Sequence, residues 1–394
     1  MQKGPASSRA LAGGLLVLLA ACSSPGAKQT AATPSASAAR TSAAGLSTTP
    51  APAADAAVVL TDWDASGSTY TLSLVSTSAT VLATAHATWT RGARCGPVQA
   101  GIIAPPPVSA SNRRAYYLDG SAIRWLGEDG KTGLAFQGLS NNAIKAYGLA
   151  VAPDDSVYAL NTIDYSTSPI SQRITITKVG ASSLGTEIYS ATSPSNAATA
   201  AVWPVGWRNG DLVLAYHSGT CTQGGGPGLA DAQSYHVVSA QTADRKATIG
   251  SDTGAACGLV GAPAPAGILC GNYQGIGDQA STQVLNWSGQ RVAGFGAWFL
   301  PGGLAPQGHG YVGNGVSGNQ APLTLIRAAG GQVTVPVGDC FACPVLWIDD
   351  AHFVVTLNSG AVQVFASGPE PLQGLSTTAK GLPLGRIPGS LDGT

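Results

Sequence analysis

The sequence has few charged residues, and their charges cancel. Lys and Arg together number 20, Asp and Glu together number 20, and these four types make up 10% of the chain, against about 25% in typical domains. Nucleic-acid backbones are bound by clusters of basic side chains. Because this chain has no basic excess, we expect it not to bind nucleic acid.

Long apolar runs and catalytic motifs are also missing. After residue 21 no stretch reaches the roughly 18 apolar residues of a spanning helix, and no convincing amphipathic helix follows residue 55. The chain has no G-x-S-x-G motif and no H-x-x-x-H spacing among its five His, the patterns typical of hydrolase nucleophiles and zinc sites. We therefore expect no catalytic residue, no metal site and no cofactor.

The N-terminus has the pattern of an export signal. Lys3 and Arg9 precede an apolar stretch of 12 residues at positions 10–21, which is the length of a secretory signal core and too short to span a bilayer. The stretch ends in Leu19-Ala20-Ala21-Cys22, which resembles the bacterial lipobox. The resemblance implies cleavage before Cys22 and a lipid on its sulfur. The alternative is an ordinary signal with a chance Cys.

A low-complexity segment follows. Residues 23–54 are nearly all Ala, Ser, Thr, Pro and Gly and cannot bury enough apolar surface to offset their ordering entropy. The sequence thus predicts a signal peptide at 1–21, a lipidated Cys with a disordered linker at 22–55, and a folded domain at 56–394. We expect that domain outside the cytoplasm, on the cell envelope, held to the membrane by its lipid.

Six further cysteines agree with export, because an even number in an oxidising compartment favours disulfides. Local pairing would join Cys257 with Cys270 and Cys340 with Cys343, which leaves Cys95 with Cys221. Six cysteines allow 15 pairings, and the others stay open.

The folded domain shows a repeat of about 45 residues. Seven units place a tight turn before a strand rich in β-branched and aromatic residues, with turns near 66, 112, 154, 209, 266, 307 and 349. Several units are followed by a further strand, such as residues 122–126 or 361–365. Four short strands per 40–50 residues are typical of a β-propeller blade.

We therefore predict an all-β fold, a propeller of seven four-stranded blades, with six or eight blades and a pair of β-sandwiches as alternatives. A strand in the final stretch, 377–394, is expected to close the ring against Val58 to Leu60, and the alternative is a frayed tail. The two longest spacings would carry insertions, including Gly224-Gly225-Gly226-Pro227.

The turn units resemble the WD-repeat-like propellers of exported bacterial proteins, including those of the Tol-Pal system. The similarity is clearest in Ala152-Pro153-Asp154-Asp155 and in Arg208-Asn209-Gly210-Asp211, each leading into an apolar strand. The chain also resembles exported lipoproteins of high-GC bacteria. The resemblance implies the fold and not a function.

Other candidates for chemistry have simpler interpretations. Cys340-Phe341-Ala342-Cys343 is a C-x-x-C, for which a structural disulfide is favoured over redox activity or zinc. The acid pairs 154–155 and 349–350 fit turn chemistry better than calcium binding. We expect the five His (86, 217, 236, 309 and 352) to be structural or exposed. The Trp at 203, 207, 298 and 347 are expected to pack between blades, with a sugar- or peptide-binding face as the alternative.

These observations predict a non-catalytic binding or scaffold module for an envelope protein or a cell-wall glycan. The alternative is a propeller hydrolase or lyase with its site at the mouth of the axial channel, or a purely structural envelope protein. An enzyme would need carboxylates or His to converge on the axis, and the acids to locate are Asp119, Asp164, Asp211, Asp252 and Asp339.

Overall fold

Turns that need unusual backbone angles separate short strands along the chain. Asn209 and Gly210 have φ angles of 49° and 77°, the conformation of a two-residue type I′ hairpin, which Asn-Gly adopts readily. Between turns the side chains alternate, as in residues 81–88, where buried and exposed positions follow each other. This alternation is typical of strands with one face turned to a core.

The computed structural model describes part of the chain. The described residues are 55–89, 94–95, 100–102, 107–142, 144–167, 169–193, 201–217, 221–222, 232–250, 258–271, 282–295, 299–315, 322–338, 340, 343–368 and 370–392. For some strand residues beside the gaps only the backbone is described. The lipobox Cys22 and the signal peptide and linker up to residue 54 lie outside these ranges.

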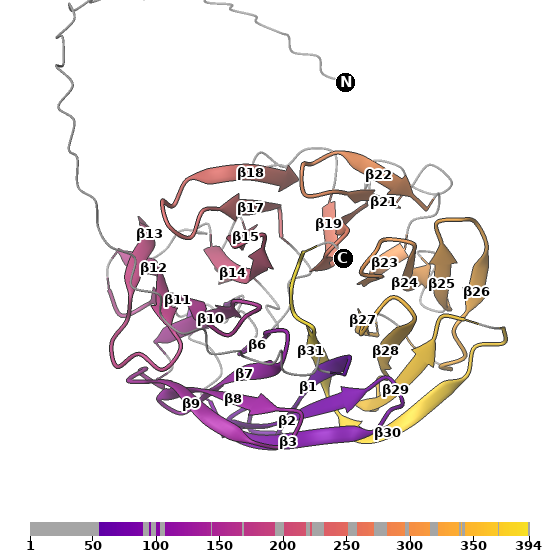
Figure 1. Cartoon of the computed structure of the whole chain (residues 1–394), viewed down its shortest axis with the longest axis horizontal. Coiled ribbons are helices and arrows are strands. Elements are labelled where there is room, and N and C mark those ends of the chain that lie inside the picture. Colours follow the sequence, from indigo (N-terminus) through magenta and orange to yellow (C-terminus); the bar gives the residue numbers. More distant parts are fainter. Residues whose placement is uncertain are drawn as a thin grey trace, which may run out of the picture. The chain divides into compact units, whose positions relative to one another are not determined.

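Seven antiparallel four-stranded sheets form a ring, which confirms the predicted seven-bladed propeller (Figure 1). In each blade the innermost strand faces the axis. From inside to outside, blade 1 has β31 (Leu382–Ile387), β1 (Ala57–Trp63), β2 (Thr69–Ser76) and β3 (Val81–Thr88). Blade 2 has β6 (Val108–Ala110), β7 (Arg114–Asp119), β8 (Ala122–Gly127) and β9 (Thr132–Gln137). Blade 3 has β10 (Lys145–Val151), β11 (Val157–Asp164), β12 (Ile170–Lys178) and β13 (Thr186–Ser193).

The other four blades follow the same order. Blade 4 has β14 (Ala201–Arg208), β15 (Asp211–His217), β17 (Ser234–Val238) and β18 (Arg245–Gly250). Blade 5 has β19 (Gly258–Ala264), β20 (Gly267–Gly271), β21 (Thr282–Leu285) and β22 (Arg291–Gly294). Blade 6 has β23 (Phe299–Leu304), β24 (Gly310–Gly315), β25 (Leu323–Arg327) and β26 (Gln332–Thr334). Blade 7 has β27 (Val345–Trp347), β28 (His352–Thr356), β29 (Ala361–Ala366) and β30 (Gly374–Lys380).

The hydrophobic core lies between neighbouring blades. One cluster joins Val58 and Leu60 of blade 1 to Val354 and Val364 of blade 7, and comparable clusters occupy the other junctions. Each blade therefore buries both faces. A blade alone would leave two apolar faces in water, and closing the ring removes that exposure.

The ring closes through its two ends, as predicted. β31 pairs antiparallel with β1, with Ala57 opposite Ile387 and Val58 opposite Arg386. Blade 1 thus combines one strand from the C-terminal end with three from the start of the domain. Separating the ends would expose the inner edge of β1, so the pairing stabilises the whole ring.

Two details differ from the sequence prediction. The turn near 66 joins the second and third strands of blade 1, whereas the other six predicted turns join the first and second strands of their blades. The cause is the closure, since the C-terminal strand takes the innermost place. A small extra sheet was also not predicted and contains β4 (Arg94–Cys95), β5 (Ala100–Ile102) and β16 (Cys221–Thr222). Residues 224–227 lie outside the described ranges.

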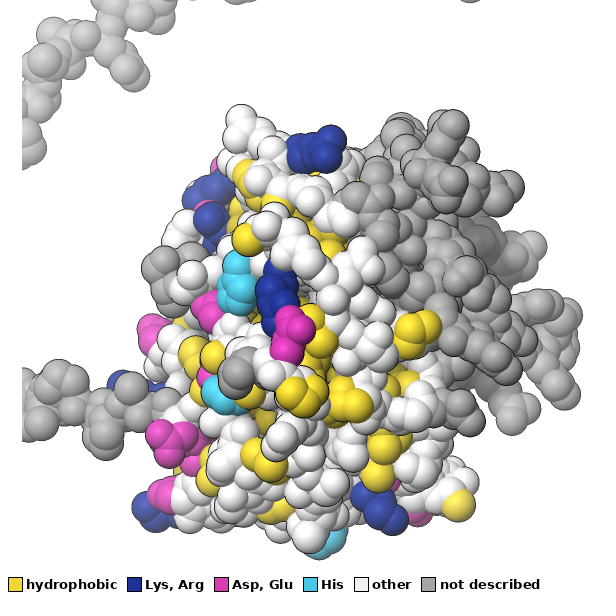
Figure 2. Space-filling model, turned by 90° about the vertical axis from the view of Figure 1, so that its right-hand side faces the viewer, with side chains coloured by type: hydrophobic (Ala, Val, Ile, Leu, Met, Phe, Trp, Pro, Cys, Tyr) yellow, Lys and Arg dark blue, Asp and Glu magenta, His cyan; other side chains and the backbone are white. Residues whose placement is uncertain are grey.

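The outer surface carries scattered charges. On the side of the ring shown in Figure 2, Lys and Arg side chains lie singly or beside Asp and Glu among uncharged groups. Within the ranges described, the chain has no helix long and apolar enough to cross a membrane.

Candidate functional site: the axial cavity

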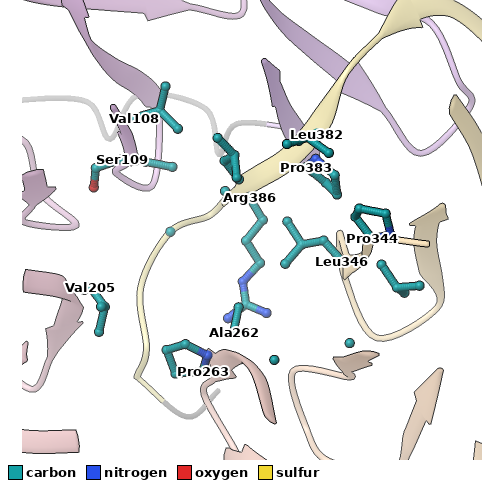
Figure 3. Close-up of a pocket in the computed structure, with 18 of the residues that line it drawn as sticks. Val108, Ser109, Val205, Ala262, Pro263, Pro344, Leu346, Leu382, Pro383 and Arg386 are labelled. Atoms are coloured by element: carbon teal, nitrogen blue, oxygen red, sulfur yellow. The ribbon is translucent and has the colours of Figure 1, made fainter. Parts of the chain in front are cut away.

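The innermost strands enclose a cavity of about 430 Å³ on the ring axis (Figure 3). Every blade contributes to its wall. The lining residues are 108–110, 149, 204–206, 261–263, 302–304, 343–346, 382–386, 389 and 391. Cavities that hold small molecules usually measure about 300–1,000 Å³, so this one has the size of a ligand site.

The wall is made of small and apolar side chains, with four prolines at positions 204, 263, 344 and 383. An innermost strand has one edge without a partner, and proline is tolerated there because it has no N–H to lose. Glycine allows the strands to approach closely. Gly261 has a φ of 74°, and a Cβ at this position would collide with the carbonyl oxygen of Gly302 in the next blade. The prolines and glycines of the innermost strands therefore explain why these strands lie close together and why the cavity wall is mainly apolar.

Arg386 is the one charged residue among the described residues of the wall. It lies near the end of β31, and its side chain points across the cavity toward Ala262 and Pro263 of β19 (Figure 3). Its Nη2 donates a hydrogen bond to the carbonyl oxygen of Ser390 at 3.4 Å. Burial lowers the pKa of the guanidinium to about 10, and the negative charge of Asp350 partly offsets this effect. Arg386 is therefore still protonated at neutral pH.

The segment after β31, residues 388–392, is called the C-terminal strap here. The Gly389 amide donates to the carbonyl of Ser111 at 2.9 Å, beside blade 2. The Leu391 amide donates to the carbonyl of Trp207 at 3.0 Å, in blade 4. The strap thus leaves blade 1 and crosses the axis to the far side of the ring (Figure 1).

Leu391 anchors the far end of the strap. Its side chain is 5% exposed and packs in the cluster that joins Trp203 of blade 4 to Ile268 of blade 5. The fit requires Gly206, because a Cβ at this position would lie 2.7 Å from Leu391 Cδ1. The strap therefore fills the junction of blades 4 and 5 and forms part of the cavity wall.

The predicted Cys340–Cys343 disulfide is present. Both residues are buried, and Cys343 also lines the cavity. The disulfide therefore lies in the segment that leads into β27, next to the axis.

The other predicted disulfides stay predictions. Cys270 is buried in β20, whereas Cys257 lies outside the described ranges. Cys95 and Cys221 are strand residues of the same small sheet, where each pairs with a residue of β5.

The candidate acids do not meet at the axis in the described part of the ring. Each of the three that are described pairs with a cation away from the cavity wall: Asp119 with Arg124 at 2.8 Å, Asp164 with Lys145 at 3.2 Å and Asp211 with Lys246 at 2.7 Å. Asp252 and Asp339 lie outside the described ranges. The described acids act as partners for neighbouring Lys and Arg.

The acid pairs at the hairpins are turn residues, as predicted. Asp154 Oδ1 accepts a hydrogen bond from the Ser156 amide at 3.1 Å. Asp349 Oδ1 accepts from the amides of Ala351 at 2.8 Å and His352 at 2.7 Å. The first acid of each pair therefore stabilises its own turn.

The second acid of each pair contacts the preceding blade, which sequence reasoning missed. Tyr116 of blade 2 donates its hydroxyl to Asp155 of blade 3 at 2.9 Å. The backbone N–H of Gln307 in blade 6 donates a hydrogen bond to Asp350 of blade 7 at 2.8 Å, and His309 Nδ1 lies 3.6 Å from the same carboxylate. The first contact joins strand β7 to the turn of blade 3, and the second joins the turns of blades 6 and 7.

The His and Trp residues that are described take part in packing and local hydrogen bonds. Trp207 Nε1 donates to the carbonyl of Ala150 at 3.0 Å and Trp347 Nε1 to that of Gly303 at 2.8 Å, each across a blade junction. His236 stacks on Tyr216 with ring centroids 5.7 Å apart. Trp298 and the side chain of His217 lie outside the description. The packing role predicted for the described Trp is confirmed.

Comparisons with known proteins do not assign this chain to a family. No protein family profile and no curated protein matches this chain. A solved structure that matches is hydrazine synthase from Kuenenia stuttgartiensis, with a TM-score of 0.38 and 11% identity, covering 67% of this chain and 77% of that one. The likeness of the turn units to Tol-Pal propellers stays a prediction.

Proposed function

We propose that this protein is a lipid-anchored, extracytoplasmic β-propeller that acts as a non-catalytic binding module of the cell envelope, with the axial cavity as its binding site. The observation that carries the proposal is an apolar cavity of about 430 Å³ with one guanidinium in its described wall. Pockets of this size and composition, with few polar groups, are typical of small-molecule sites.

The distribution of acids supports binding over catalysis. A hydrolase or lyase at the channel mouth would need carboxylates or His positioned around the reacting bond. The described wall has neither, and the three described candidate acids pair with cations elsewhere. The arrangement offers a place to hold a molecule and no described pair of groups to transfer a proton.

The surface and the cavity also favour one class of ligand over the two expected from sequence. Among the described residues, the exposed large apolar side chains are Leu134, Val292 and Leu375 on three different strands, with Ile144 and Leu184 in connecting segments. Scattered residues of this kind do not mark a protein docking surface. A glycan would need many hydrogen-bonding groups, whereas the described wall is mostly carbon. A small, mainly apolar envelope molecule fits better.

A cavity-filling variant tests the proposal. Isothermal titration of the full chain in amphipol with the neutral probe 4-phenylbutan-1-ol is expected to show saturable binding. Ala262→Phe, which fills the cavity from β19, should weaken this binding at least about ten-fold, because the probe and the new ring compete for one volume. Ala366→Phe, at an exposed position of β29, is the matched control and should bind like wild type. Equal binding by the Ala262→Phe variant would refute the proposal.

A further inference from the structure

Arg386 carries a positive charge in an apolar place. The guanidinium has five N–H donors, and its hydrogen bond to Ser390 is the one it makes with described residues. Within the ranges described, no carboxylate lies within 4.0 Å of it. Asp350, whose charge acts on Arg386 from a distance, already accepts a hydrogen bond from Gln307 and lies beside His309.

Holding the strap does not account for this arginine. The strap is fixed by the amides of Gly389, Ser390 and Leu391, which donate to blades 2 and 4 at 2.9 to 3.2 Å, and by the burial of the Leu391 side chain. A single bond of 3.4 Å adds little to these contacts. Arg386 is half-buried, and a neutral side chain would avoid the cost of partly removing its charge from water. The charge is therefore better explained by an anionic partner.

Charge balance favours a partner with one negative charge. A carboxylate brings one negative charge, which one guanidinium neutralises, whereas a doubly charged phosphate would leave a net negative charge in the cavity. The planar guanidinium also matches a carboxylate with two parallel hydrogen bonds. The remaining wall, with residues such as Leu346, Leu382 and Pro263 (Figure 3), suits an apolar body.

We propose that the axial cavity binds an apolar carboxylic acid whose carboxylate pairs with Arg386. This inference rests on the proposed function and adds the chemical class of the ligand. Charge-assisted hydrogen bonds are worth more than neutral ones, and their loss is expected to change affinity by about ten- to a hundred-fold.

Three probes with one body and different heads test the inference on the full chain in amphipol. Isothermal titration should rank 4-phenylbutyrate above 4-phenylbutan-1-ol by about ten-fold or more, and the alcohol above 4-phenylbutylammonium. Equal affinity for the acid and the alcohol would overturn the inference and leave the proposed function standing. No saturable binding of any probe would overturn both. This comparison uses the wild-type chain and is independent of any variant's folding.

Variants then test whether the preference for the acid probe over the alcohol depends on Arg386. Arg386→Met keeps the length and removes the charge, so the acid should bind no better than the alcohol. Arg386→Lys keeps the charge without the fork and should retain part of the preference. Arg173→Met, at an exposed site on β12 that faces Glu187, is the matched control and should bind like wild type. A preference for the acid that survives Arg386→Met in a folded variant, as judged by circular dichroism, would overturn the assignment.

Discussion

Replacing Leu391 by Ala should show how much the C-terminal strap contributes to the ring. The side chain is 5% exposed among Trp203, Tyr235 and Ile268 of two blades. Truncating a buried Leu to Ala costs about 2–5 kcal/mol, and we expect about 3 kcal/mol here. Residues 55–392 have an unfolding entropy of about 0.7 kcal/mol per kelvin, from ~2.1 cal/mol per kelvin per residue. The expected fall in Tm is therefore about 4 °C, measured by differential scanning calorimetry.

A second variant, Gly206→Ala, tests the same contact between Gly206 and the Leu391 side chain. A Cβ at this position would lie 2.7 Å from Leu391 Cδ1 and 3.1 Å from Cγ, so Gly206→Ala should cost about 1–3 kcal/mol in the wild-type chain. In the Leu391→Ala background the added methyl group enters vacated space, and most of this cost should disappear. The double variant is thus expected to be more stable than the sum of the single effects by about 1 kcal/mol or more.

The control is Leu134→Ala on β9, where the side chain is 50% exposed and the cost should stay within about 0.5 kcal/mol. A Tm for Leu391→Ala within about 1 °C of wild type would show that the strap is not inserted between blades 4 and 5. Additivity of the Gly206 and Leu391 variants to within about 0.5 kcal/mol would refute the contact between them.

Two further outcomes are expected. The hydrogen bond from Ser66, with smaller contributions from neighbouring groups, lowers the pKa of Asp64 to about 2. Because the pKa in the folded state lies below that in the unfolded state, the ionised Asp64 stabilises the fold above about pH 4. This stabilisation is lost as the pH falls toward 2. Ser66→Ala should therefore move the NMR titration midpoint of the Asp64 carboxyl upward, and an unchanged midpoint would contradict this cause. At the N-terminus, Cys22→Ala should abolish the incorporation of labelled palmitate while Ser23→Ala retains it; labelling of the Cys22→Ala variant would exclude the lipobox.

Features that depend on residues close together in the sequence could be predicted, whereas sites that bring together residues of several blades could not. Turn chemistry predicts Asn209-Gly210 and the first acid of each pair, Asp154 and Asp349, because these residues act within a few positions of themselves. The contacts of Asp155 and Asp350 with the preceding blade are not local and were not predicted. The strands between the turns show their alternation in the sequence, and repeated blades with two apolar faces imply a ring. The Cys340–Cys343 bridge and the pairing of Val58 with the C-terminal strand follow from the same local and repeat-level reasoning.

The sequence by itself thus determined the seven turn-and-strand units, the number of blades and the closure, because these depend on neighbouring residues and on the period of the repeat. It did not predict the small extra sheet or the place of the first unit within its blade. Only the tertiary structure decided what lines the axis. The wall joins residues of seven blades, and which side chain of each inner strand faces the cavity depends on strand register and on β-bulges. Arg386 and Leu391 have no distinguishing motif. Arg386 acquires its role because β31 is the innermost strand of blade 1, which faces the cavity. Leu391 acquires its role because the chain after β31 crosses the ring and places this side chain between blades 4 and 5, more than a hundred residues away in sequence.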